Sequence, residues 1–525
     1  MKQGVFKYIF VLSFIILLII TYVVFYSKED SKSEVEDKVS TTSNLITNLR
    51  LGIAELDTLN PILTNNKNVK EISRLIFEPL LTVKDDYGLE YVLAKEIAKE
   101  DNLTYIITLR NDVKWQDGTT FTSQDVKFTI DMIKNKAYSS YSSNLQYVDR
   151  LDIIDENTIK ITLSQEVEFF EYNLTMPIIS NNYFNGEDIE TSEKNNAPMG
   201  TGIFKFSVNE NGVLKFVPNA LYWNSQKKPL LTEIDVNIYD SIGNMYAAFK
   251  SGYIDIMEVD SKNIQTYIGS LGYTKVDIPE RDVTFLSFNT GFDVLADSRT
   301  RKAIAFYIDK ANLMANVGNG YLQTNFLLPS NSWFYDTKLD TVYLESHTAD
   351  GLLNEAGWVY QNNRWQNSEG KILKFSIIVD ANHPDKVNAA NVIANQLANH
   401  GIEVSVRQET TEGFANAFNN KSYECIIAGI HTGFSPKVTA LFNTNNLANY
   451  NSENLNTILS DIKSTTDYTK QKANYSRLYD EYLNSFPYIF LYRSTSSVVY
   501  NQTLCGKISP NSYSMFYNIE KWYRQ

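Results

Sequence analysis

The stretch from Leu109 to Lys134 constrains the fold of this chain more than any other part of its sequence. It reads LRNDVKWQDGTTFTSQDVKFTIDMIK. This order predicts a short strand, a tight turn at Trp115 to Gly118, and a helix capped by the Thr or Ser that precedes Gln124. A cap three residues ahead of an acid such as Asp125, with apolar residues following at helical spacing, is typical of a helix start. The stretch therefore predicts an α/β protein in which this helix buries one face.

Length and charge narrow the class of protein further. With 525 residues, the chain can form two or three domains with large cores. Its net charge of −13 leaves no basic stripe to neutralise phosphates, so we expect no nucleic-acid partner. Tyr and Phe are abundant, which suits pockets that bind polar ligands by stacking and hydrogen bonding. Codon bias in an AT-rich genome explains the same composition equally well.

An apolar run near the N-terminus is a membrane signal. Tyr8 to Tyr26 carries no charge over nineteen residues. A helix of that length covers roughly 28 Å, at about 1.5 Å per residue, of a hydrocarbon core of about 30 Å. Lys2 and Lys7 place the N-terminal side in the cytoplasm, and a cleaved signal peptide would need a small-x-small site that the run lacks. We predict that residues 1–26 form a single-pass anchor in the cell membrane and residues 27–47 a polar tether to an extracellular globular part.

Several short motifs along the chain carry a family resemblance. In the opening stretch the order is Leu-Arg, Val-Lys-Trp, Asp-Gly-Thr, Phe-Thr and Asp-Val. Further motifs are Leu59-Asn60-Pro61, Glu78-Pro79-Leu80, Gly200-Thr201-Gly202, Tyr222-Trp223-Asn224 and the LLNEAGW of Leu352 to Trp358. Together they resemble the periplasmic and extracellular solute-binding proteins of the peptide and nickel class, the large binding components of ABC importers. The resemblance covers the chain from Leu51 to about Leu491.

This resemblance implies an α/β fold of two lobes, the class II type of periplasmic-binding-protein fold, with an extra subdomain inserted in the first lobe. Lobe I would comprise residues 48–82, 200–296 and 497–525, the inserted subdomain residues 83–199, and lobe II residues 297–496. In the family the inserted subdomain mostly builds shape. We therefore interpret Trp115 and Asp117 as structural residues.

Two helices are expected from their own residues. Val69 to Leu81 has apolar residues at helical spacing and predicts one amphipathic helix that Pro79 ends. A second helix is expected to start after Asp297 or Ser298. On that helix we expect Arg301 to form a structural ion pair rather than to contact a ligand carboxylate.

The two cysteines leave the question of a disulfide open. Cys425 lies in an apolar run that predicts a buried strand, where a thiol behaves as a small hydrophobe. Cys505 is eighty residues away, and sequence spacing does not establish whether the two meet. Gram-positive relatives usually carry a lipid on a cysteine just after the signal, and no cysteine occurs in the first 400 residues here.

The loop that binds the ligand's ammonium group in peptide-binding members of this family is altered in this chain. Those members usually have Trp-x-x-Asp-x-x-Asp-Pro there, and the first aspartate pairs with the ligand. Counting back from Pro436, Thr432 takes the place of that aspartate, Ser435 takes the place of the second, and the Trp has no counterpart. A neutral or differently charged ligand then fits the loop better, and His431 and Thr432 could donate to an acceptor on it. We predict these ligand-binding residues: Glu55, Asn60, Ile430, His431, Thr432, Gly433 and Phe434.

Signatures of catalysis and of metal binding are missing from the sequence. The four histidines are scattered, and the chain has no His-Glu-x-x-His, Cys-x-x-Cys or Gly-x-Ser-x-Gly. Ser460 to Lys463 fits Ser-x-x-Lys without its companion motifs. Gly200-Thr201-Gly202 lacks the lysine of a phosphate-binding loop. We therefore expect no enzymatic activity, catalytic residue, cofactor or metal site.

The sequence thus predicts the extracellular substrate-binding component of an ABC importer. It would capture a small solute, above all an oligopeptide, between two closing lobes and deliver it to a membrane permease. The partners would be that ligand, the permease subunits and the cell membrane, through the N-terminal helix. The alternative is a membrane-anchored sensor or adaptor built on the same fold, which the altered loop and the unusual anchor favour. An extracellular hydrolase lacks its nucleophile.

Overall fold

The computed structural model describes residues 47–135, 139–268, 272–465 and 467–525. The predicted anchor, Tyr8 to Tyr26, lies outside these residues. Within them, no helix is both long enough and apolar enough to cross a membrane. Residues 47–524 pack as one unit, which holds every sheet described below.

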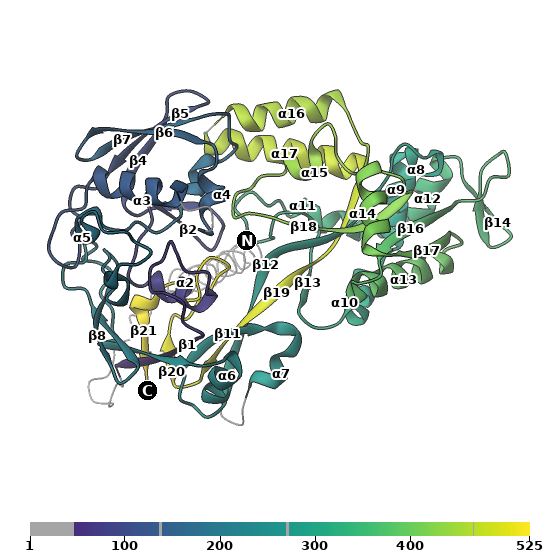
Figure 1. Cartoon of the computed structure of the whole chain (residues 1–525). Coiled ribbons are helices and arrows are strands. Elements are labelled where there is room, and N and C mark those ends of the chain that lie inside the picture. Colours follow the sequence, from purple (N-terminus) through teal and green to yellow (C-terminus); the bar gives the residue numbers. More distant parts are fainter. Residues whose placement is uncertain (1–46, 136–138, 269–271, 466) are drawn as a thin grey trace, which may run out of the picture. The chain divides into compact units, whose positions relative to one another are not determined.

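A four-stranded sheet of order β1-β10-β9-β8 opens the described chain (Figure 1). β1 is parallel to β10, and the other pairs are antiparallel. Leu49, Leu51 and Ile53 are buried along β1 because alternate strand residues point to the same face. The bounds are β1 (Asn48–Ala54), β8 (Phe204–Glu210), β9 (Val213–Pro218) and β10 (Glu233–Tyr239), with α2 (Lys67–Ser73) and α6 (Ile242–Lys250) beside β1.

A second sheet, of order β4-β5-β7-β6, is antiparallel throughout. Its bounds are β4 (Ala94–Lys99), β5 (Thr104–Leu109), β6 (Val148–Asp155) and β7 (Thr158–Leu163), and the hairpin β2 (Leu81–Val83) and β3 (Leu89–Tyr91) precedes it. The predicted helix is α3 (Ser123–Asn135). Its start is confirmed: the Thr122 hydroxyl accepts from the Gln124 amide at 3.3 Å, and Asp125 accepts from the Thr122 amide at 2.9 Å.

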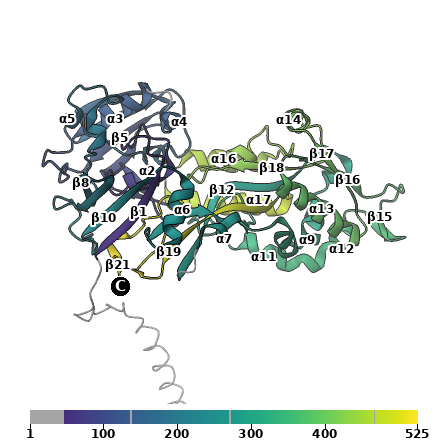
Figure 2. The same cartoon turned by 60° about the horizontal axis from the view of Figure 1, so that its bottom comes forward.

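The largest sheet has seven strands. Its order is β11-β19-β12-β18-β16-β17, with β13 beside β19. β12 and β19 are its longest strands, and they lie side by side from β11 to the helices at the other end (Figures 1 and 2). The bounds are β11 (Ile256–Asp260), β12 (Tyr273–Phe288), β13 (Tyr321–Gln323), β16 (Lys374–Asp380), β17 (Glu403–Glu409), β18 (Cys425–His431) and β19 (Tyr488–Asn501).

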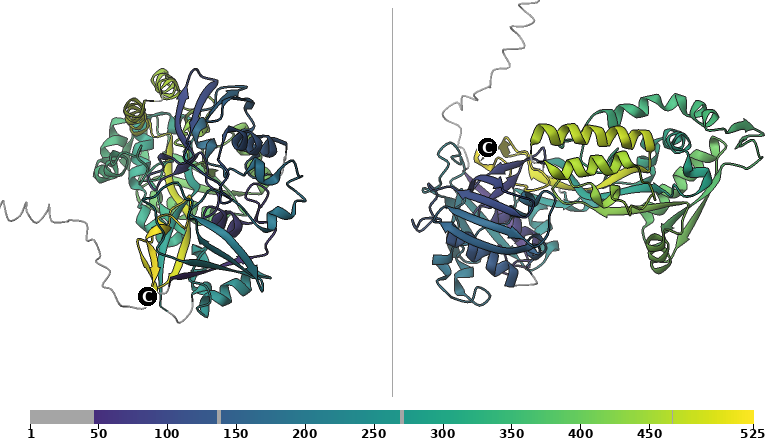
Figure 3. Two further views of the ribbon diagram at one scale, coloured as in Figure 1. Left: turned by 90° about the vertical axis from the view of Figure 1, so that its left-hand side faces the viewer. Right: turned by 90° about the horizontal axis from the view of Figure 1, so that it is seen from above.

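Successive side chains of β12 point to opposite faces of the sheet, and they therefore pack into two different cores. Val283 and Phe285 join one core with α16 and α17, whereas Leu286 and Phe288 join another with α9 and α13. α16 and α17 lie against each other (Figure 3). The helices of this part are α9 (Ser298–Tyr307), α10 (Lys310–Val317), α12 (Ala349–Glu355), α13 (Pro384–Asn399), α14 (Thr411–Asn420), α16 (Glu453–Ser464) and α17 (Tyr468–Ser485).

The predicted long helix from Val69 to Leu81 is wrong. α2 ends at Ser73, and the next residues form tighter turns in which Leu75 and Ile76 bond three residues back. Their own carbonyls then accept from the amides of Phe204 and Gly202. The helix stops because a neighbouring strand, and not its own next turn, takes these carbonyls.

Arg301 is structural, but the predicted ion pair is wrong. Asp297 caps α9 as expected. The guanidinium of Arg301 is buried and donates to the backbone carbonyls of Leu295, Ala296, Ser485 and Phe486. It therefore satisfies carbonyls around the end of α17, which would otherwise be left without donors.

Candidate functional site

Three of the sequence motifs meet at one buried carboxylate. Glu78 accepts hydrogen bonds from Thr201 at 2.9 Å, from Tyr222 at 3.0 Å and from the indole of Trp223 at 3.1 Å. Burial raises the pKa of Glu78 to about 7, although these three donors act in the opposite direction. Both carboxylate oxygens are thus satisfied from within the protein, and the cluster joins three segments of the chain.

The two glycines of Gly200-Thr201-Gly202 allow a close backbone approach. A Cβ atom on Gly200 would lie 1.9 Å from the carbonyl oxygen of Ile76, and one on Gly202 would lie 2.6 Å from that of Leu75. Only glycine fits at such distances. The motif therefore serves packing between two backbone segments, as its missing lysine suggested.

The polar side chains of the stretch from Leu109 to Lys134 also form hydrogen bonds within the protein. The indole of Trp115 donates to Asp125 at 3.2 Å, and Asp125 also accepts from the Asn181 amide at 2.8 Å. Asp117 accepts from the amide and the hydroxyl of Thr119. These contacts fix the turn and the helix start, so the signature identifies the fold rather than a site.

A cavity of about 320 Å³ lies beside the middle of β12, and we call it the β12 cavity. β12 changes its register with β19 between Pro279 and Val283, which re-aims the side chains in between. The lining comes from α2 and β11 on one side, and on the other from the loop after β18 and the chain near the C-terminus. The lining residues are Lys67, Lys70, Glu71, Arg74, Glu258, Ile278, Pro279, Glu280, Arg281, His431, Phe434, Ser496 and residues 511–515.

The structure brings two of the predicted loop residues into this cavity. His431 lines it, and its Nδ1 forms a hydrogen bond with Oδ1 of Asp282 at 2.8 Å. Phe434 lines it and packs edge-on against Tyr513, with ring centroids 5.4 Å apart. Thr432 lies between them. Its amide and hydroxyl both donate to the carbonyl oxygen of Arg281, at 2.8 and 3.0 Å.

The remaining predicted residues lie elsewhere. Ile430 packs on the core under β18, and Gly433 is exposed in the loop. Glu55 ends β1 with a positive φ of 54° and an exposed side chain. Asn60 is buried, donates to Asn195 at 2.9 Å and accepts from the Ile62 amide at 3.1 Å, so its amide group is occupied in a turn.

Charges in the β12 cavity divide into paired and unpaired groups. Lys67 pairs with Glu258 at 2.7 Å, and Arg74 pairs with Glu71 at 3.2 Å. Arg281 lies over the Phe434 ring at 4.5 Å. Among the described residues, its guanidinium finds no hydrogen-bond or ion-pair partner. Burial lowers the pKa of Arg281, which is the expected effect on a cation partly removed from water.

Sequence reasoning missed the residues that give this cavity its charge. Arg281 stands in the charged run Glu280 to Asp282, directly before the buried end of β12, and this run was the available signal. Lys70 projects from α2, whose partners depend on the tertiary fold. Asn511 and Tyr513 belong to a C-terminal segment without any periodic pattern.

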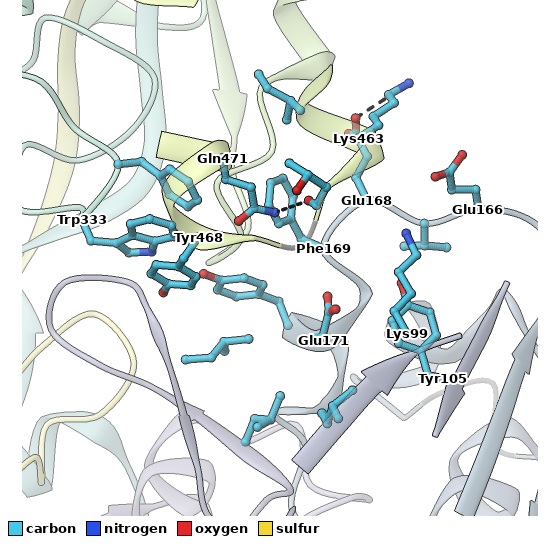
Figure 4. Close-up of a pocket in the computed structure, with 18 of the residues that line it drawn as sticks. Lys99, Tyr105, Glu166, Glu168, Phe169, Glu171, Trp333, Lys463, Tyr468 and Gln471 are labelled. Atoms are coloured by element: carbon cyan, nitrogen blue, oxygen red, sulfur yellow. Dashed lines mark hydrogen bonds and ion pairs between the residues drawn. The ribbon is translucent and has the colours of Figure 1, made fainter. Parts of the chain in front are cut away.

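A second cavity, of about 300 Å³, lies between the β4-β5 side and the C-terminal helices (Figure 4). Glu166, Glu168 and Glu171 face it together with aromatic rings. Glu168 accepts from the Thr439 hydroxyl at 2.7 Å and lies 3.8 Å from Lys463. These contacts tie the chain after β7 to Thr439, which precedes α16, and to α16 itself, so this carboxylate links two parts of the unit.

Neither cysteine forms a disulfide in the structure. Cys425 is buried in β18, as its apolar run predicted, and Cys505 is partly exposed. Burial raises the pKa of the Cys425 thiol, which keeps it unreactive. The described residues contain no group of three or more His, Cys, Asp or Glu side chains that could hold a metal ion.

Comparisons with known proteins agree with this geometry. The oligopeptide-binding protein AppA of Bacillus subtilis is 23% identical over 495 residues, which is 90% of each chain. The unliganded open form of the murein tripeptide-binding protein MppA, known from Escherichia coli, matches with a TM-score of 0.75 at 18% identity, covering 91% of this chain and 98% of that one. NikZ of Campylobacter jejuni in complex with Ni(L-His) matches with a TM-score of 0.53 at 23% identity, covering 91% and 99%.

These structural matches support a two-lobe α/β fold for this chain. The family model for the bacterial extracellular solute-binding proteins, family 5, matches residues 88–452, which is well over half of the sequence. The chain belongs to the bacterial extracellular solute-binding proteins of family 5.

Proposed function

We propose that this protein captures an oligopeptide outside the cell and delivers it to the permease of an ABC importer. The observation that carries the proposal is the β12 cavity, whose walls come from segments on both sides of the two long strands. A ligand bound there would contact both walls at once and exclude water between them. The names of AppA and MppA, which refer to peptides, support this class of ligand.

We further propose a division into two lobes. Residues 48–82, 200–296 and 497–525 would form lobe I, with residues 83–199 inserted, and residues 297–496 would form lobe II. β19 runs from lobe II into lobe I, and β12 of lobe I pairs with it and with β18 of lobe II, so bending of these two strands would close the lobes.

The proposed ligand contacts centre on the β12 cavity. His431 and Phe434 would touch the ligand directly, and Ile430, Thr432 and Gly433 would complete that wall. Glu55 stays a proposed contact at the exposed end of β1. Asn60 would act by holding its turn, because its side chain already has two partners.

We also propose how the protein is held outside the cell, namely by a membrane anchor. Family 5 proteins are extracellular or periplasmic solute-binding proteins. The uncharged run Tyr8 to Tyr26 supports a single-pass anchor that keeps the binding part close to its permease. Protease digestion of intact cells would release a fragment beginning after residue 26 if the anchor is retained.

Thermal unfolding of the full chain in detergent tests the capture of peptides. A ligand that binds only the folded state raises the unfolding midpoint in proportion to the logarithm of its concentration. We expect a pool of random pentapeptides to raise the midpoint by several degrees, while the matching mixture of free amino acids leaves it unchanged. A flat midpoint with the peptide pool at millimolar concentration would contradict the proposal.

A membrane-anchored ligand sensor on the same fold is the second candidate, and the threonine at position 432 favours it. Crosslinking in native membranes separates the two functions. A permease subunit recovered with the full chain supports transport, and a signalling protein recovered instead supports sensing.

A further inference from the structure

We propose that the β12 cavity holds a carboxylate of the ligand between Arg281, Lys70 and the side-chain amide of Asn511. This inference rests on the proposed capture of peptides and names the group of the peptide that the site recognises. The carboxylate comes from the C-terminus of the peptide or from an acidic side chain, and the experiment below separates the two sources.

Arg281 is the main element of this anion site. It lies in the segment where β12 shifts its register, and its guanidinium stands 4.5 Å from the ring centre of Phe434. No described residue forms a hydrogen bond or ion pair with the guanidinium. The guanidinium is half-buried, and Asp282 and Glu280 attract it without forming an ion pair, so a ligand carboxylate would supply the missing bidentate partner.

The backbone of Arg281 is held firmly in place. Thr432 donates to its carbonyl oxygen from both the amide and the hydroxyl. Arg493, which is buried, donates to the carbonyl oxygen of the preceding Glu280 at 3.0 Å. The threonine that replaces the aspartate of peptide-binding relatives is therefore occupied, and it fixes the strand that carries a cation.

Asn511 supplies a second donor. Its Oδ1 accepts from the amides of Tyr513 and Ser514, both at 2.9 Å, which fixes the orientation of the side-chain amide. Its Nδ2 is buried and has no hydrogen-bond partner among the described residues. Asn511 lines the β12 cavity. A buried donor without an acceptor costs free energy, which an acceptor on a ligand would recover.

The remaining charges favour an anion as well. The pairs Lys67 with Glu258 and Arg74 with Glu71 cancel. Lys70, Arg281 and Glu280 remain as the unpaired charges of the lining, and Asp282, which attracts Arg281, lies beside the lining with its carboxylate bonded to His431 at 2.8 Å. Lys70 is partly buried, and burial lowers its pKa, as expected for a cation without a partner. A ligand carboxylate would meet two cations and an amide donor here, against the single unpaired carboxylate of Glu280 in the lining.

The test uses the full chain in detergent and isothermal titration with four pools of random pentapeptides. One pool has free ends, one is N-acetylated, one is C-amidated, and one is C-amidated with a glutamate at a fixed position. We expect the free and acetylated pools to bind alike and the amidated pool to bind roughly tenfold or more weaker. Recovery of affinity in the glutamate pool would assign the site to an acidic side chain; no recovery would assign it to the C-terminus.

Variants connect the effect to Arg281. Arg281→Gln should remove the difference between the free and amidated pools, and Arg281→Lys should restore part of it. Arg150→Gln is the matched control, because Arg150 is an exposed residue paired only with Asp152. Unfolding midpoints of all variants establish that they fold.

Two outcomes separate this inference from the proposed function. Equal binding of the free and amidated pools, with no effect of Arg281→Gln, would overturn the carboxylate site and leave peptide capture standing. Failure of every pool to bind would overturn both.

Discussion

The Glu78 cluster and the β12 cavity use buried charge in opposite ways. Glu78 has a hydrogen bond from each of three neighbours, and both of its oxygens are occupied. Asn511 has a buried amide donor without an acceptor among the described residues, and the half-buried guanidinium of Arg281 has no hydrogen-bond partner among them. We interpret the satisfied carboxylate of Glu78 as structural and the open donors of the β12 cavity as contacts for a ligand.

This comparison predicts that substitutions around Glu78 act on stability and that substitutions in the β12 cavity act on binding. The four tests below run from the largest expected effect to the smallest.

Gly200→Ala should have the largest effect on stability. The added Cβ atom would lie 1.9 Å from the carbonyl oxygen of Ile76, and neither backbone segment can retreat without breaking its hydrogen bonds. We expect the free energy of unfolding to fall by about 3 kcal/mol in denaturant titration. Gly243→Ala is the control, because its Cβ would meet only Ser241 Oγ at 3.8 Å in α6. If both variants kept the stability of the parent, the close approach would not hold the two segments together.

Glu78→Ala should lower the free energy of unfolding by about 2 kcal/mol, because three buried donors lose their acceptor. The affinity of the folded protein for peptides should not change. Glu90→Ala is the control, since Glu90 is half exposed and, among the described residues, its ion pair is the one with Lys227 at 3.9 Å. A loss of affinity in Glu78→Ala without a loss of stability would reverse the roles given to the two regions.

The pH dependence of stability should carry the signature of Glu78. Its folded pKa of about 7 lies above the ordinary value of 4.5, so the folded state binds more protons than the unfolded state between these pH values. The free energy of unfolding should therefore fall as pH rises from about 4.5 to about 7, and Glu78→Gln should flatten that slope. A slope that survives in Glu78→Gln would assign it to other groups.

Arg281→Met should change stability least, by less than about 0.5 kcal/mol, because the guanidinium has no internal hydrogen bond to lose and burial already opposes its charge. Denaturant titration of the full chain measures this directly. A loss as large as that of Glu78→Ala would mean that Arg281 supports the fold.

The sequence predicted the parts of the fold that depend on local pattern. The capped start of α3 followed from Thr122 and Asp125, and the buried strand β18 followed from its apolar run. The motifs around Glu78 identified the family before their meeting point was known. Local chemistry and spacing were sufficient for these elements because their partners lie within a few residues.

Features that depend on distant partners could not be predicted. The helix does not continue past Ser73, because the amides of Phe204 and Gly202 take the carbonyls of Leu75 and Ile76. Arg301 bonds to carbonyls at the end of α17, far along the chain. The candidate site shows the same limit. His431 and Phe434 were predicted to line it, but Arg281 and Asn511 come from a strand irregularity and a patternless segment.

The most direct test of this account is mass spectrometry of whatever the full chain carries after gentle purification and denaturation. The account predicts a set of peptide masses that is strongly depleted in Arg281→Gln and retained in Arg150→Gln. An identical load in all three proteins, or a single non-peptide compound, would contradict it.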